Sequence, residues 1–177
     1  MSSKINSRSP VSVPGPTGRR PWSTELLREW AALRYPGVHL YEQVRLGPTP
    51  VSLSGVTVSP ELERMLKLEN WYADGILVLT DQVLIIEAKV QATPGAISQV
   101  KFYWRQALRT ADLANLIGMN WTPVVLWAED DADVSNFARG EGVRVEIYTP
   151  PWIADYLQLV QFRNRIPAPQ QVTGELT

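Results

Sequence analysis

The chain of 177 residues contains no cysteine and a single histidine, His39. The absence of cysteine excludes disulfides and thiolate chemistry, and a Ser-His-Asp triad or a multi-histidine metal site would depend on His39 alone. No apolar run approaches the roughly 18 residues that a membrane span requires. The N-terminus also lacks the apolar core of a signal peptide. We therefore expect a cytoplasmic, non-secreted protein that has no membrane partner.

Acidic residues are missing from the first part of the chain. Residues 1–21 are rich in Ser, Pro and Gly and carry a charge of +4 from Lys4, Arg8, Arg19 and Arg20. The remainder has 13 Lys and Arg against 18 Asp and Glu, a net charge of −5, so any nucleic-acid binding there must use a local patch. We expect residues 1–21 to form a flexible arm, residues 22–163 one domain and residues 164–177 a tail.

Hydrophobic periodicity predicts alternating helices and strands. Helices are expected near 24–34, 60–70, 94–113 and 151–162, and strands near 38–46, 75–80, 83–89, 122–129 and 143–149. Ser23 is the expected N-cap of the first helix. The stretch from 47 to 59 is expected to be a loop or weak hairpin, and the acidic segment 129–136 a loop. This order predicts an α/β protein, an α/β/α sandwich around a mixed sheet.

The stretch ADGILVLTDQVLIIEAKV, residues 73–90, consists of two apolar runs around a polar turn at Asp81 and predicts a hairpin. Three further charged residues stand within the two apolar runs. Asp74 stands at the front of the first strand, and Glu87 and Lys89 stand at the end of the second. Facing residues of an antiparallel pair lie on one face of the sheet, as do residues two apart in a strand. We therefore predict that the three side chains converge at the open end of the hairpin.

The length of the turn decides whether this convergence occurs. A two-residue turn at Asp81 and Gln82 places Asp74 opposite Lys89. A four-residue turn keeps the same parity, whereas a three-residue turn would send Asp74 to the other face. A salt bridge between Asp74 and Lys89 on the surface is the structural alternative.

Two carboxylates a few ångströms apart repel each other and need a cation. Oxygen ligands without a Cys or His cluster select a hard ion, Mg²⁺ or Mn²⁺. A lysine beside that ion can position or deprotonate a water, or steady a phosphate. The combination suits hydrolysis of a phosphodiester.

These residues resemble the PD-(D/E)XK nuclease superfamily, which has the restriction-endonuclease-like fold. The family pattern is an acid at the start of one strand and acid-x-lysine on the next, with a helix on either side. Here it reads Asp74 and Glu87-Ala88-Lys89, with Ala73 in place of the family's proline. The resemblance covers roughly residues 23–130. It implies an αβββαβ core, extended here by an extra strand and a C-terminal helix, in which Asp74, Glu87 and the Ala88 carbonyl bind the metal and Lys89 serves the attacking water.

The family often adds a glutamate from the helix before the sheet, and two candidates exist. Glu25 lies in the first turn, where the helix dipole favours any acid. Glu29 flanks the apolar face next to Leu26 and Leu33, so it can reach the edge of the sheet. We assign Glu29 to the catalytic set, with a solvated helix charge as the alternative for both.

The helix after the hairpin offers two further groups of polar residues. Gln99 and Tyr103 form a Gln-x-x-x-Tyr pattern that resembles the RecB-type exonuclease branch. Lys101, Arg105 and Arg109 form a basic stripe on the opposite flank, so only one flank can face the site. We assign Gln99 to the catalytic set and Tyr103, Lys101 and Arg105 to nucleic-acid contacts, with a solvated helix face as the alternative for the stripe.

The resemblance implies a metal-dependent DNA nuclease, endo- or exonucleolytic, of a kind found in phage and mobile-element genomes. The alternative is a non-catalytic structural or assembly protein, such as a virion component, that keeps the same fold and belongs to the phage particle. The basic arm on an acidic body is expected to bind DNA, or the acidic segment 129–133 of a neighbouring subunit in a homo-oligomer or larger assembly.

Overall fold

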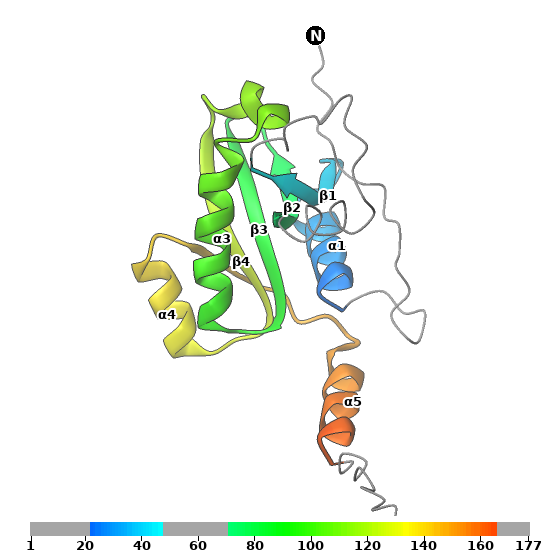
Figure 1. Cartoon of the computed structure of the whole chain (residues 1–177). Coiled ribbons are helices and arrows are strands. Elements are labelled where there is room, and N and C mark those ends of the chain that lie inside the picture. The colour runs from blue at the N-terminus through cyan, green and yellow to red at the C-terminus, as the bar shows by residue number, and fades with distance from the viewer. Residues whose placement is uncertain (1–21, 48–70, 166–177) are drawn as a thin grey trace, which may run out of the picture.

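The computed structural model describes residues 22–47 and 71–165, which form one five-stranded mixed sheet with helices on both faces (Figure 1). The helices are α1 (Trp22–Arg34), α3 (Pro94–Ala107), α4 (Ala132–Gly140) and α5 (Ile153–Arg165), with a 3₁₀ helix η1 (Ala111–Leu116). The strands are β1 (Leu40–Leu46), β2 (Trp71–Val78), β3 (Gln82–Gln91), β4 (Asn120–Glu129) and β5 (Arg144–Ile147). The order in the sheet is β1-β2-β3-β4-β5; β1, β2 and β3 pair antiparallel, and β4 pairs parallel with β3 and with β5. The predicted α/β class and mixed sheet are confirmed.

Several predicted segments lie outside the described residues. They are the arm at 1–21, the loop or weak hairpin from 48 onward, the helix at 60–70 and the tail from 166 onward. Among the helices that the structure describes, none combines the length and the apolar character needed to cross a membrane.

The central strand β3 is buried on both faces because helices cover it from either side. Val83 and Ile85 pack toward α3, and Leu84 and Ile86 pack toward α1. Successive residues of a strand point to opposite faces, so a strand covered on both sides is apolar at almost every position. The buried polar residue of β3, Glu87, therefore stands out from its surroundings.

Helix α1 covers one face of the sheet with side chains at helical spacing, namely Leu26, Leu27, Trp30 and Ala31. It begins at Trp22, so Ser23 lies inside its first turn and the prediction of Ser23 as N-cap is wrong. Trp22 packs against Trp152 and against Tyr156 of α5, with ring centroids 4.9 and 5.5 Å apart. These aromatic contacts hold the first turn of α1 against the start of α5.

Helix α3 ends at Ala107, earlier than the predicted end near residue 113. The Thr110 hydroxyl donates to the Gln106 carbonyl at 2.9 Å and accepts from the Gly47 N–H at 2.9 Å. A threonine hydroxyl that bonds to the backbone in this way competes with the regular helical pattern. The chain continues as η1 instead.

The acidic segment predicted as a loop contains the start of α4. The Asp131 side chain accepts from the N–H groups of Asp133 and Val134 at 3.0 and 3.1 Å, which satisfies donors that have no partner within the helix. Ser135 and Ala138 are buried against the rest of the domain. The loop prediction is therefore wrong from Ala132 onward, because one of the acidic residues caps a helix.

The burial of α1 gives a matched test of the packing. Leu27 is 1% exposed and Leu33, on the same helix, is 65% exposed. We expect Leu27→Ala to lower the free energy of unfolding by about 2–5 kcal/mol, and Leu33→Ala to change it by less than about 0.5 kcal/mol. Urea denaturation measures both, and equal losses in the two variants would contradict this placement of α1.

Candidate functional site

The turn of the central hairpin lies one residue earlier than the sequence predicted. The Leu79 N–H donates to the Gln82 carbonyl at 2.9 Å, so the two turn residues are Thr80 and Asp81. Gln82 belongs to β3, where it pairs with Asn120 of β4. The prediction of a turn at Asp81 and Gln82 is wrong because the parallel neighbour draws Gln82 into the sheet.

The observed register differs from the predicted one in which residue of β3 lies opposite Asp74. Gly75 pairs with Ile86, so the next position, Asp74, comes opposite Glu87 rather than Lys89. Moving the turn by one residue shifts each partner by two positions, and residues two apart in a strand share a face. Asp74 and Glu87 interact with each other and with Tyr103 of α3, so the charged residues meet on the face that α3 covers, as predicted.

The Asp74 carboxylate takes over part of the backbone pairing between β2 and β3. The regular register ends at Gly75 and Ile86. Beyond it, Asp74 Oδ2 accepts from the Ala88 N–H at 3.0 Å, and Oδ1 accepts from Gln43 Nε2 at 3.3 Å. A backbone donor of β3 is thus satisfied by a side chain, which fixes the carboxylate at the open end of the hairpin.

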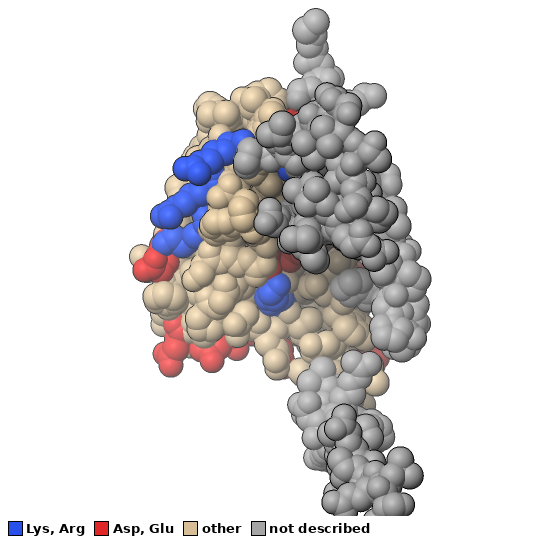
Figure 2. All heavy atoms as spheres, in the orientation of Figure 1, with Lys and Arg blue, Asp and Glu red and all other residues tan. Residues whose placement is uncertain are grey.

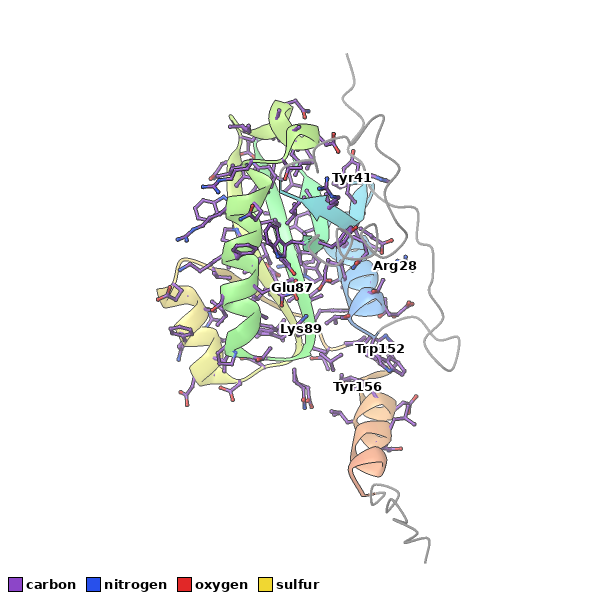
Figure 3. The ribbon with its side chains drawn as sticks, viewed as in Figure 1. Arg28, Tyr41, Glu87, Lys89, Trp152 and Tyr156 are labelled. Carbon is purple, nitrogen blue, oxygen red and sulfur yellow. The ribbon has the colours of Figure 1, made fainter. Side chains whose placement is uncertain are left out.

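Glu87 brings a buried and incompletely satisfied carboxylate to the same place. Its side chain is 1% exposed; Oε1 accepts from Lys89 Nζ, and buried Oε2 has no hydrogen-bond donor among the described residues. An unsatisfied buried oxygen of an ionised group is costly, so Oε2 needs a proton or a cation. Lys89 is 38% exposed and lies two residues further along β3 (Figure 3).

Burial and mutual charge shift the titration of this group of residues. Burial, together with the charge of Asp74, raises the pKa of Glu87 to about 7. Burial also raises the pKa of Asp74, although the Ala88 N–H and the charge of Lys89 oppose the shift. For Lys89, burial lowers the pKa, but the bond to Glu87 and the negative charges outweigh it and raise the pKa. Two neighbouring acids thus resist ionising together.

Of the two polar flanks of α3, the one with Gln99 and Tyr103 faces the acids. Gln99 Nε2 donates to Tyr103 Oη at 2.6 Å, and Tyr103 is buried in the core on this face. Burial raises the pKa of Tyr103, and the charges of Glu87 and Asp74 raise it further. Tyr103, predicted as a nucleic-acid contact, therefore lies within the electrostatic reach of the acidic pair.

The basic stripe of α3 lies on its outer flank. Lys101 and Arg105 line an open cavity of about 200 Å³ between α3 and the region of α4, together with Phe102, Phe137 and Glu141. Lys101 forms an ion pair with Glu141 at 2.5 Å. Figure 2 shows basic residues gathered over the upper part of α3 on the solvent side. The predicted nucleic-acid contacts Lys101 and Arg105 thus stand apart from the acidic pair.

Glu29 is not brought to the acidic pair. Its Oε1 accepts from Trp152 Nε1 at 2.8 Å and its Oε2 accepts from Tyr148 Oη at 3.2 Å. Both aromatic residues pack with the cluster on the α1 side of the sheet. The assignment of Glu29 to the catalytic set has no support in this arrangement, because both of its oxygens bond to the segment between β5 and α5.

Among the residues that the structure describes, Asp74 and Glu87 form an acidic pair and not a larger cluster. Within residues 22–47 and 71–165, no group of three or more His, Asp or Glu side chains could hold a metal ion. The residue that sequence reasoning missed is Gln43, which donates to Asp74 from β1. An isolated glutamine in a strand gives no signal of this contact, because it depends on a backbone angle that the residue type does not reveal.

No family model matches the chain, and no curated protein is detectably similar to it in sequence. Among solved structures, the chain is similar to the crystal structure of a protein of unknown function, AF1548, with 10% sequence identity and a TM-score of 0.43. The match covers 84% of this chain and 72% of that chain. Similarity at this level supports no statement about function.

The raised pKa of Glu87 predicts a pH-dependent stability. The folded chain holds this proton up to about pH 7, whereas an unfolded glutamate releases it near 4.5, so stability falls as the pH rises through this window. The titratable groups that face the Glu87 carboxyl are Asp74, Lys89 and Tyr103. We expect wild type to lose up to about 3 kcal/mol between pH 4.5 and 7.5, and Glu87→Gln to lose less.

Urea unfolding of both proteins at several pH values measures this difference. Because the comparison is between two proteins at each pH, the other titrating groups cancel where they are unaffected by the substitution. Parallel curves for wild type and Glu87→Gln would contradict the raised pKa of Glu87.

Proposed function

We propose that this chain is a metal-dependent DNA nuclease of the PD-(D/E)XK type with a restriction-endonuclease-like core. The observation that supports the proposal most is the buried Oε2 of Glu87, which has no donor among the described residues and stands next to the Asp74 carboxylate. A purely structural glutamate at this depth would be expected to have every oxygen satisfied. In the isolated chain a proton held by Glu87 beside Asp74 can satisfy this oxygen, and in the proposed function a divalent cation takes the place of that proton.

The donor set fits a hard divalent ion. Asp74 and Glu87 supply carboxylate oxygens, and the Ala88 N–H that bonds to Asp74 points to the β2 side of β3. The carbonyl of a residue in a strand points to the same side as its N–H, so the Ala88 carbonyl is the expected third ligand. Mg²⁺ or Mn²⁺ bound there would stabilise charge on a phosphate and lower the pKa of a water.

Lys89 supplies a cation at the boundary between the buried acids and solvent. Its raised pKa keeps it protonated at neutral pH, so it is suited to hold a phosphate oxygen or orient a water and not to accept a proton. Its stem is partly buried and its amine is held by Glu87. This anchoring fixes the charge beside the place where the phosphate would lie.

Tyr103 adds a hydrogen-bond donor from α3. Its raised pKa keeps the phenol protonated, and the Gln99 amide already donates to the phenol oxygen. Within the part of the chain that the structure describes, no acceptor engages the O–H, so it can donate toward the acids or a bound phosphate. We propose that Gln99 orients Tyr103 and that Tyr103 contacts the substrate.

The first test is cleavage of linear, nicked and branched DNA with Mg²⁺ or Mn²⁺. We expect Asp74→Asn and Lys89→Ala to lower the rate by about 10²-fold or more, since each removes a group that binds the metal or stabilises the transition state. Glu29→Gln serves as a control, because Glu29 bonds to Tyr148 and Trp152, and it should retain the wild-type rate. Equal cleavage by wild type and Asp74→Asn would reject the proposal.

A non-catalytic assembly protein that keeps this fold is the second candidate. The engagement of Glu29 by Tyr148 and Trp152 favours it, because the described part of the site is left with a pair of acids. Titration of the folded wild type with Mn²⁺ distinguishes the two. Binding that Asp74→Asn abolishes supports the nuclease, and no binding supports the assembly protein.

We further propose that the outer face of α3 contacts the DNA backbone through Arg105 and Lys101. Phosphate contacts release counterions, so each lost contact lowers the slope of log affinity against log salt by about 1. We expect Arg105→Ala to weaken DNA binding and flatten this slope. Arg139→Ala, at an exposed arginine of α4 that bonds to Asn136, is the matched control. Identical slopes for Arg105→Ala and wild type would rule out the contact.

A further inference from the structure

Gln43, in the middle of β1, has a backbone conformation that is unusual for its residue type. Its φ is +49°, and it is the non-glycine residue with positive φ among the residues that the structure describes. A side chain in this left-handed region costs free energy, and such residues persist where the surroundings determine them. Glycine or asparagine would be the ordinary choice for a strand that needed this angle for shape alone.

The unusual angle coincides with a change of face in β1. Leu40 packs on the α1 side and Tyr41 on the α3 side, as alternation requires. Three residues after Tyr41, however, Val44 also packs on the α3 side, followed by Leu46. Strict alternation would place Val44 on the α1 side. Gln43, the left-handed residue between Tyr41 and Val44, interrupts the alternation, so both side chains point to the same face of the sheet.

The paired strand β2 changes face at the same level. Ala73 and Ile76 both pack on the α3 side although they are three residues apart. The cross-strand register pairs Glu42 with Gly75 and Val44 with Ala73, so Gln43 stands opposite Asp74. The irregularity in both strands is therefore centred on the residue pair Gln43 and Asp74.

The side chains of this pair are in contact. Gln43 Nε2 donates to Asp74 Oδ1 at 3.3 Å, while Asp74 Oδ2 accepts from the Ala88 N–H at 3.0 Å. One oxygen of the carboxylate is thus directed to β3 and the other is held from β1. The carboxylate lies between two elements that both constrain its rotation.

We propose that Gln43 is the positioning residue of the site: its left-handed backbone aims the side-chain amide at Asp74 Oδ1, and this contact holds Asp74 Oδ2 on the Ala88 N–H. The reading of the carboxylate as a metal ligand rests on the proposed function, but the positioning itself is a property of the chain without any ligand. It explains why a polar, conformationally costly residue occupies a position where an alternating strand would continue.

The test is amide hydrogen exchange of the full chain without added metal. In Gln43→Ala the Ala88 amide should exchange about tenfold faster, as expected for weakening of one charge-assisted hydrogen bond. The Leu84 amide, inside the regular pairing with Leu77, should be unchanged. Gln43→Gly should behave like Gln43→Ala, because glycine adopts the positive φ without cost and lacks the amide.

The matched control is Gln91→Ala. Gln91 is an exposed glutamine near the same end of the hairpin whose Nε2 donates to Glu129 at 2.9 Å, so its removal deletes the same kind of bond without touching Asp74. Ala88 exchange should stay at the wild-type rate in this variant. Unchanged Ala88 exchange in both Gln43→Ala and Gln43→Gly would overturn the positioning role.

A second measurement links the positioning to the metal. If the wild type binds Mn²⁺, Gln43→Ala should weaken binding by about tenfold or more, the usual cost of losing a residue that orients a metal ligand, and Gln91→Ala should not. Equal Mn²⁺ affinity of Gln43→Ala and wild type would overturn the inference. If the wild type binds no Mn²⁺, the proposed function fails, and the exchange of Ala88 still decides the positioning role.

Discussion

The hydrogen bond from the Ala88 N–H to the Asp74 carboxylate is the contact on which the arrangement of the site depends. The antiparallel pairing of β2 and β3 stops at Gly75 and Ile86, and without a substitute the N–H of Ala88 would be left unpaired in a buried region. A carboxylate fills this place. The sheet therefore tolerates a charge in its interior because that charge completes its hydrogen bonding, and the same contact sets Asp74 beside Glu87.

A second consequence is that burial and charge are opposed at this end of the hairpin. Burial raises the pKa of both acids, so ionising the pair costs more free energy in the isolated chain than it would in water. Lys89 offsets part of this cost at Oε1 of Glu87, and nothing among the described residues offsets it at Oε2. The domain keeps a destabilising group in its centre, which is common where a side chain serves binding or chemistry and not folding.

The sequence predicted the elements of the sheet better than the details between them. The strands formed where apolar residues cluster, and the face shared by Glu87 and Lys89 followed from their spacing of two. The approach of Asp74 to them survived because a two-residue turn that moves by one position does not change the parity of the pairing. The turn itself depended on the pairing of Gln82 with Asn120, a contact between distant segments. The helix in the acidic segment depended on Asp131 acting as its N-cap. Because aspartate is also common in solvated loops, the residue type alone did not indicate a helix.

The site was predictable where it depends on strand geometry, and unpredictable where it depends on tertiary contacts. Gln99 and Tyr103 were recognisable as a pair at helical spacing. Which flank of α3 faces the sheet, and hence the separation of Arg105 from the acids, required the packed structure. The partners of Glu29 are Tyr148 and Trp152, more than 100 residues further along the chain. No local sequence pattern indicates these contacts.

The contacts of Glu29 also constrain how the chain can fold during synthesis. Its two partners lie 119 and 123 residues further along the chain, and the Trp22 ring packs on the same segment. Helix α1 is therefore synthesised long before the residues that bond to its Glu29 carboxylate and pack on its Trp22 ring. Long-range closure of this kind slows folding, and until it occurs the Glu29 carboxylate and the Trp22 ring lack these partners.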